Sequence, residues 1–233
     1  MEKEEFEEMA EIERTNWWFR ARRELVSKFL RGGKKALDVG CGTGGNAECF
    51  SKSMHIIGLE KNAYAASIAK GRGIDVREGD ACALPFGDGE FDTIFLLDVL
   101  EHIQDDEKCL SECRRVLGGD GRMIITVPAN SWMFSDYDRK LGHVRRYEKV
   151  ELEEKVRGFF RVKECFYWNS LLLIPEIVRR KMIRTEGAST GQLKTGKLAD
   201  SVLHSILSFE NFIAGLGVHP PFGISLVLVG ERN

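Results

Sequence analysis

Short apolar runs alternate with longer segments of helical period along most of the chain from residue 36 onward. The runs are rich in β-branched or aromatic residues and are bounded by Gly, Pro or Asp, which favours strands over buried helices. We therefore expect strands at residues 36–39, 55–60, 74–78, 91–97 and 122–127. Helices are expected to begin at Gly45, Ala63 and Asp105. This alternation is typical of a parallel sheet covered by helices on both faces.

The flanking segments have their own patterns. The first 31 residues are predicted to be helical, and Gly32 with Gly33 ends that segment. After Pro128 the periodicity weakens through residues 129–147, whose aromatic content favours a functional loop over disorder. The rest of the chain is predicted to form a helix at 148–160, strands at 162–168 and 224–230, and between these strands two helices near 171–183 and 198–216.

Composition narrows the class of protein. The chain has 34 Lys+Arg against 36 Asp+Glu, a formal net charge of -2, and 43% hydrophobic residues. These values are those of an ordinary globular protein and give no basic footprint, so no nucleic-acid partner is expected. The six cysteines form no Cys-x-x-Cys pair, and we assign no metal. An acidic N-terminus and apolar runs too short to span a bilayer predict a cytoplasmic protein.

A glycine-rich turn follows the first predicted strand. Gly40, Gly42, Gly44 and Gly45 let the backbone turn tightly and approach a ligand, and the next helix offers unpaired N–H groups. The spacing Gly40, Gly42, Gly45 also satisfies the G-x-G-x-x-G pattern of dinucleotide-binding folds, so NAD is one alternative. Asp38 favours another ligand, because a carboxylate beside this turn suits the cationic S-adenosylmethionine better than a pyrophosphate.

Several motifs recur in the order of a known family. They are Leu-Asp-Val-Gly-Cys-Gly-Thr-Gly at 37–44, an acid ending the second strand at Glu60, Gly-Asp-Ala at 79–81, Phe-Asp at 91–92 and Val-Leu-Glu-His at 99–102. In these motifs the chain resembles the class I S-adenosylmethionine-dependent methyltransferases, closest to their small-molecule branch and to a poorly characterised prokaryotic subgroup. The resemblance implies an α/β fold: a doubly wound, seven-stranded, mostly parallel Rossmann-like sheet with the last strand inserted antiparallel.

The resemblance also implies a cofactor site for S-adenosyl-L-methionine. The residues it assigns to that site are Asp38, Gly40, Cys41, Gly42, Glu60, Lys61, Asp80, Ala81, Asp98 and Val99. We predict a single domain over residues 1–233. Its parts are an N-terminal helical cap at 1–33, the cofactor-binding core at 34–168, a helical insertion at 169–222 and the last strand at 223–233.

Two histidines are the candidate catalytic residues. His102 follows the fourth strand, and His143 lies in the 129–147 loop, at the sheet edge where open α/β folds place substrates. We expect His143 to act as a base or orienting group for a hydroxyl acceptor, with Arg145 or Arg146 holding an anionic part of the substrate. The alternatives are a packed capping histidine at 102 and a solvated basic loop around 143.

The predicted reaction is direct in-line transfer of a methyl group to a small-molecule or lipid-linked acceptor, at oxygen or nitrogen. Two alternatives are an NAD-dependent oxidoreductase or epimerase and a non-catalytic S-adenosylmethionine-binding partner subunit. The aromatic residues 17–19 form either a lid over the cofactor or a packing cluster. The helix near 171–183 has an apolar start and a basic end, compatible with peripheral membrane contact or with packing on the sheet. The oligomeric state is not predicted.

Overall fold

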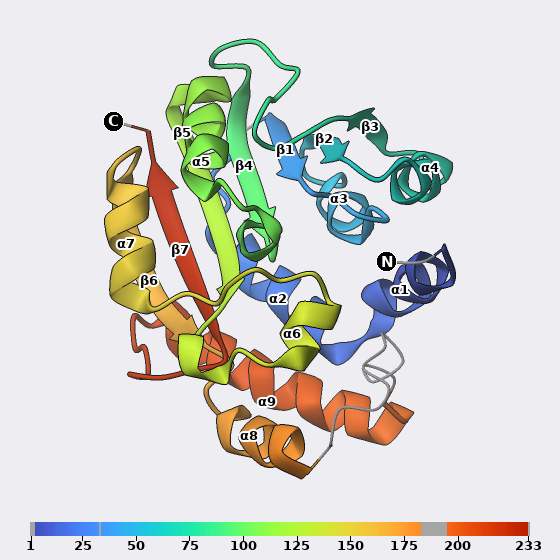
Figure 1. The fold of residues 1–233 in the computed structure, drawn as a ribbon, viewed down its shortest axis with the longest axis vertical. Helices are drawn as coiled ribbons and strands as arrows, with labels where there is room; N and C mark the ends of the chain where they lie inside the picture. Colours follow the sequence, from blue (N-terminus) through green and yellow to red (C-terminus); the bar gives the residue numbers. More distant parts are fainter. Residues whose placement is uncertain (1–2, 33, 183–194, 233) are drawn as a thin grey trace.

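A mixed sheet of seven strands forms the centre of the computed structural model, which describes residues 3–32, 34–182 and 195–232 (Figure 1). The strand order is β3-β2-β1-β4-β5-β7-β6. The strands are β1 Lys35–Val39, β2 His55–Glu60, β3 Asp75–Glu78, β4 Phe91–Leu97, β5 Leu117–Pro128, β6 Arg161–Trp168 and β7 Ser225–Glu231. The first five pair in parallel, whereas β7 is antiparallel to both β5 and β6. The predicted sheet is confirmed, including its inserted last strand.

Helices cover both faces of this sheet. The helices are α1 Lys3–Thr15, α2 Trp17–Ser27, α3 Gly45–Phe50, α4 Ala63–Gly71, α5 Asp106–Val116, α6 Asp136–Lys140, α7 Lys149–Arg157, α8 Leu173–Met182 and α9 Lys197–Gly215. In β4, Ile94 packs in one core cluster with α5 and α7, while its neighbour Phe95 packs in another with α2, α3 and α4. Because successive strand side chains point to opposite faces, these two clusters are the two layers of a doubly wound fold.

The structure corrects three details of the prediction. Asn16 splits the N-terminal helical segment, because its side chain accepts from the Trp18 N–H and caps a second helix. The loop at 129–147 contains a helical turn, η2 Ser131–Met133, as well as α6. Strand β5 begins at Leu117, five residues earlier than expected, because Gly118, Gly119 and Gly121 obscure its apolar pattern. Residue 183, the expected end of the helix seen as α8, lies outside the described residues.

The helix α9 from the insertion packs along α2. Asn211 joins the two helices and the sheet, because its amide donates to the Ala21 carbonyl at 2.8 Å and accepts from Trp168 Nε1 at 2.9 Å. Trp18 packs on Trp168 with ring centroids 6.1 Å apart. The aromatic residues 17–19 therefore lie in a packing cluster. Within the described ranges, no helix is both long and apolar enough to cross a membrane.

Candidate active site

The glycine turn after β1 is tight on one side and open on the other. Gly40, Gly42 and Gly44 have φ values of 66°, 55° and 92°, in the left-handed region that favours glycine. A Cβ added at Gly40 would lie 2.8 Å from Cγ2 of Val99, so the turn packs directly on the segment after β4. A Cβ at Gly42 would meet no atom within 4 Å. A ligand can therefore approach the backbone at Gly42.

Asp38 is a buried carboxylate beside this turn. Its side chain lies at the end of β1 with 1% of the residue exposed, and Oδ2 has no hydrogen-bond partner among the described residues. Burial raises the pKa of Asp38 to about 7; Arg22 opposes this shift, and Glu13 and Glu60 add to it. An unpaired buried carboxylate is costly, so this position favours a cationic partner.

Glu60, Lys61 and Asp80 line the same edge of the sheet. Glu60 ends β2 and accepts from the N–H of Gly42 at 2.9 Å, which ties it to the turn. Lys61 Nζ donates to Oδ2 of Asp80 at 2.8 Å, and this hydrogen bond lowers the pKa of Asp80. Ala81 follows, partly buried against the core. The carboxyl ends of β2 and β3 therefore place these predicted residues next to the glycine turn.

Cys41 lies beneath the turn. A Cβ at Gly58 of β2 would be 2.5 Å from its sulfur, so the thiol packs on that glycine, and burial raises its pKa. The Cys41 N–H is bonded to the Leu59 carbonyl at 3.0 Å. The structure therefore gives the Cys41 side chain and N–H a role in holding the turn to β2.

Asp98 is paired with a residue that the sequence analysis did not identify. It adopts φ 60° directly after β4, and its carboxylate accepts from Arg22 and from Thr126 Oγ1. Arg22 is 3% exposed and lies over the Trp18 ring, 4.7 Å from its centroid. Arg22 gives no local signal because it sits among other arginines, 76 positions from its partner. The pair places one buried cation close to Asp38.

Helix α1 also reaches the turn. Glu13 accepts hydrogen bonds from Thr43 Oγ1 and from Arg72, and a Cβ at Gly45 would lie 2.5 Å from its carboxyl carbon. The N-terminal segment is therefore anchored on the glycine turn through one buried carboxylate. Figure 1 shows α1 beside α3 and α4.

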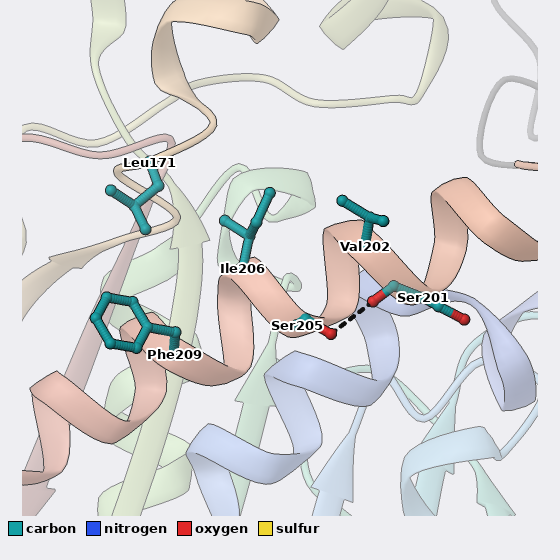
Figure 2. A pocket seen from close by; sticks show the side chains of 6 residues that line it. All are labelled: Leu171, Ser201, Val202, Ser205, Ile206 and Phe209. Atoms are coloured by element: carbon teal, nitrogen blue, oxygen red, sulfur yellow. Dashed lines mark hydrogen bonds between the residues drawn. The ribbon is translucent and has the colours of Figure 1, made fainter.

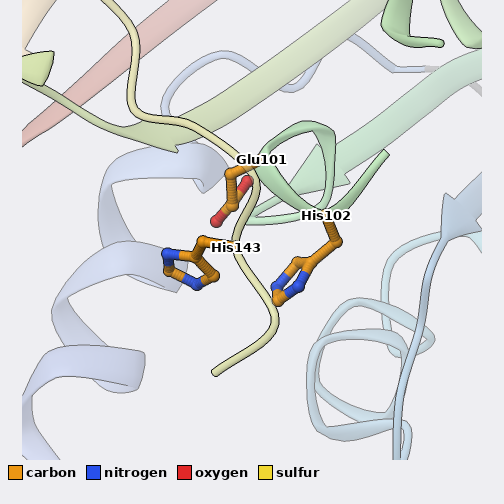
Figure 3. Close-up of side chains that lie close together, drawn as sticks. All are labelled: Glu101, His102 and His143. Atoms are coloured by element: carbon orange, nitrogen blue, oxygen red, sulfur yellow. The ribbon is translucent and has the colours of Figure 1, made fainter. Parts of the chain in front are cut away.

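The two candidate histidines lie side by side with Glu101 (Figure 3). The rings of His102 and His143 are perpendicular, with centroids 4.7 Å apart. Loss of solvent and then the neighbouring His143 lower the pKa of His102. Glu101 has no exposed surface, and neither of its carboxylate oxygens has a hydrogen-bond partner among the described residues. Burial, with Asp98 nearby, raises the pKa of Glu101 well above its ordinary range.

Both arginines of the loop form ion pairs within the protein. Arg146 is 5% exposed and donates to the fully buried Asp138 at 2.6 and 2.8 Å. Arg145 donates to the buried Asp106 at 2.8 Å. Both guanidinium groups therefore fix the loop, and the expectation that one of them holds an anionic part of the substrate stays a prediction.

Two surface hollows lie away from the predicted residues. One, of about 450 Å³, lies on the outer surface of α9 (Figure 2) and is lined by Leu171, Ser201, Val202, Ser205, Ile206 and Phe209. The other, of about 680 Å³, is lined by Ala10, Glu11, Arg14, Thr15 and Arg72. Arg72 connects the second hollow to Glu13 and so to the glycine turn.

Comparison with known proteins agrees with this geometry. Residues 37–125 match the family model described as a methyltransferase domain. A probable S-adenosylmethionine-dependent methyltransferase of Mycolicibacterium smegmatis is 31% identical over 147 residues, which are 60% of this chain and 57% of that protein. The chain thus spans a little over half the length of that curated relative.

Solved structures share the fold at low sequence identity. A Thermotoga maritima protein described as an S-adenosylmethionine-dependent methyltransferase, possibly acting on histamine, has a TM-score of 0.65 at 20% identity, covering 99% of this chain and 96% of that one. Haemonchus contortus phosphoethanolamine N-methyltransferase 2, solved with phosphomonomethylethanolamine and S-adenosylhomocysteine, has a TM-score of 0.64 at 19% identity. That match covers 100% of this chain and 58% of the other.

Proposed function

We propose that this chain, which matches a methyltransferase domain at residues 37–125 and is similar to S-adenosylmethionine-dependent methyltransferases, binds S-adenosyl-L-methionine at the glycine turn and transfers the methyl group to an acceptor. The observation that carries the proposal is Asp38, a buried carboxylate with an unpaired oxygen beside a turn that is open at Gly42. Such a site suits the cationic end of this cofactor and not a pyrophosphate.

The proposed roles follow from where each side chain lies. Asp38 would accept from the ammonium group, and Arg22, already paired with Asp98, would attract the carboxylate of the same amino-acid end. Glu60 keeps lone pairs for two ribose hydroxyls while it holds the Gly42 N–H. Asp80 and Ala81 would meet the adenine, with Lys61 fixing Asp80. The cofactor, when bound, supplies an activated methyl group, so the chain's own task is alignment and exclusion of water.

The acceptor that we propose is a small molecule or a lipid-linked molecule, methylated on oxygen or nitrogen. Exposed apolar side chains on α8 and α9 support an apolar acceptor or a peripheral membrane contact; they include Ile174, Val202, Phe209 and Phe212. Figure 1 shows these two helices beyond the carboxyl end of β4. The glycine turn after β1 and His102 after β4 lie at this same edge of the sheet. His143 would orient the acceptor there.

A label-transfer experiment tests this proposal. The purified chain is incubated with methyl-labelled S-adenosylmethionine and cell extract, which is then separated into aqueous and organic phases. We expect label in a product of low molecular mass with the wild type, and at least about tenfold less with Asp38→Asn. The control, Asp120→Asn, changes an exposed acid within β5 and should transfer label normally. Product formation equal in Asp38→Asn and the wild type would contradict the proposal.

A further inference from the structure

Glu101, His102 and His143 bring together the side-chain types that bind metal ions (Figure 3). One potential ligand atom from each residue lies within 4.8 Å of the other two. Two imidazoles and one carboxylate are a donor set that suits first-row transition metals such as Mn²⁺, Fe²⁺ and Zn²⁺. The ligands of one such ion lie about 3 Å apart, a separation that small rotations of the rings would reach.

Glu101 is the observation that points to a cation. Its side chain has no exposed surface and no hydrogen bond within the described part of the chain, an arrangement that is strongly unfavourable for the ionised form and that a bound cation would compensate. The nearest arginines are already used: Arg22 is paired with Asp98 and Arg146 with Asp138. The carboxylate is therefore buried, close to two imidazoles, and without a partner among the residues that the structure describes.

The surroundings of the two rings favour metal binding through Nε2. Nδ1 of His102 lies 3.2 Å from the Gly142 carbonyl oxygen and, in the tautomer that donates to this oxygen, leaves the lone pair on Nε2. Nδ1 of His143 lies 3.4 Å from Oδ1 of the fully buried Asp138 without a hydrogen bond among the described residues, and Arg146 holds that carboxylate in place. A backbone carbonyl and a carboxylate behind the ligand histidines are typical of metal centres.

We propose that Glu101, His102 and His143 bind one divalent first-row transition-metal ion at the carboxyl end of β4. Three protein ligands leave coordination positions open, as in catalytic sites. Two of the ligands, Glu101 and His102, closely follow Asp98 and Val99, and Val99 packs on Gly40, so the ion would lie next to the cofactor turn. The sequence analysis assigned no metal, because the third ligand is 41 positions from the second and only the fold brings it near.

The role of the ion in the reaction rests on the proposed function. The ion would hold a hydroxyl of the acceptor and lower its pKa, so that the proton leaves to solvent. The oxygen would then form a bond to the methyl carbon while the bond between that carbon and sulfur breaks, its electron pair passing to sulfur. This role favours an oxygen acceptor over a nitrogen one.

Metal titration of the full chain tests the site directly. After treatment with a chelator and dialysis, the protein is titrated with Co²⁺, followed by visible absorption, and with Mn²⁺, followed by electron paramagnetic resonance. We expect one saturable site in the wild type, and a loss of affinity of at least about tenfold in Glu101→Gln, His102→Ala and His143→Ala. The matched control is His55→Ala, an exposed histidine at the start of β2, which should bind one equivalent.

Each outcome decides the proposal. No saturable site in the wild type overturns it, as does equal affinity in the wild type and the three ligand variants. Circular dichroism identifies a variant that fails to fold, and His102→Ala, which changes an exposed side chain, then carries the test. S-adenosylmethionine binding is measured separately: its failure alongside intact metal binding would reject the proposed function and leave the metal site standing.

Discussion

Replacing Asp38 with asparagine should stabilise the protein while weakening cofactor binding. The side chain is 1% exposed, and its pKa is raised to about 7 from 3.8, chiefly by burial. A pKa raised in the folded state means that folding favours the protonated acid. Its contribution to stability is complete below about pH 4 and is lost as the pH rises through 7. At pH 8 the loss is at most about 4 kcal/mol, from about 1.36 kcal/mol per pKa unit.

Asparagine has nearly the same shape as aspartate and does not ionise, so Asp38→Asn should not lose stability as the pH rises. The free energy of unfolding of the variant, relative to the wild type, should increase between pH 5 and pH 8. The same change removes the proposed partner of the cofactor ammonium. A hydrogen bond to a charged group contributes about 1.5–3 kcal/mol, so the dissociation constant for S-adenosylmethionine should rise about ten- to hundredfold at pH 8. In the wild type, affinity should fall as the pH drops below 7, because Asp38 must first lose its proton.

Urea denaturation followed by circular dichroism at pH 5, 6, 7 and 8 measures the stability effect, with Asp120→Asn as the exposed control. Calorimetry at the same pH values measures the affinity. If the stability difference between Asp38→Asn and the wild type does not change with pH, Asp38 is already ionised in the folded protein at pH 5, and burial does not raise its pKa. The assignment of an unpaired carboxylate to this position would then be refuted.

Three further changes test other parts of the account. Gly40→Ala places a Cβ on a residue with φ 66° and against Val99, so thermal unfolding should show a free energy of unfolding lower by about 1–3 kcal/mol. Adding Val99→Ala should restore part of that free energy, and no restoration would mean that the contact with Val99 is unimportant. Arg22→Met leaves Asp98 as an unpaired charge, so calorimetry should show weaker S-adenosylmethionine binding and circular dichroism a lower melting temperature, whereas unchanged values would contradict the pairing. Phe209→Ser removes exposed apolar surface, so sedimentation with anionic lipid vesicles should show less bound protein if the proposed membrane contact exists, and equal binding would contradict it.

The sheet edge could be predicted because its signals are local. The turn at 40–45 and the acids at Asp38, Glu60 and Asp80 each follow a strand, and parallel strands bring their carboxyl ends together. Their hydrogen-bond partners could not be read in the same way. Glu60 accepts from the Gly42 N–H, and Asp80 pairs with Lys61 from the neighbouring strand end. These pairs depend on how the strand ends are placed in the fold.

The residues that the sequence did not assign act over long separations. Arg22 meets Asp98 only because α2 packs on the sheet, and helix amphipathicity gives no sign of which arginine turns inward. Glu101 appeared only as one member of a motif, and its contact with the loop that carries His143, whose Val144 N–H donates to the Glu101 carbonyl, arises only in the fold. Arg146 was expected at the substrate because its loop lies at the sheet edge where open α/β folds place substrates, whereas in the structure Asp138 holds it inside.

Calorimetric titration of the purified chain with S-adenosylmethionine and, separately, with NAD tests the central claim most directly. We expect S-adenosylmethionine to bind at one site per chain, Asp38→Asn and Glu60→Gln each to weaken this binding, and NAD to give no saturable heat. If NAD bound and S-adenosylmethionine did not, the proposed cofactor and the role of every residue at the glycine turn would be contradicted.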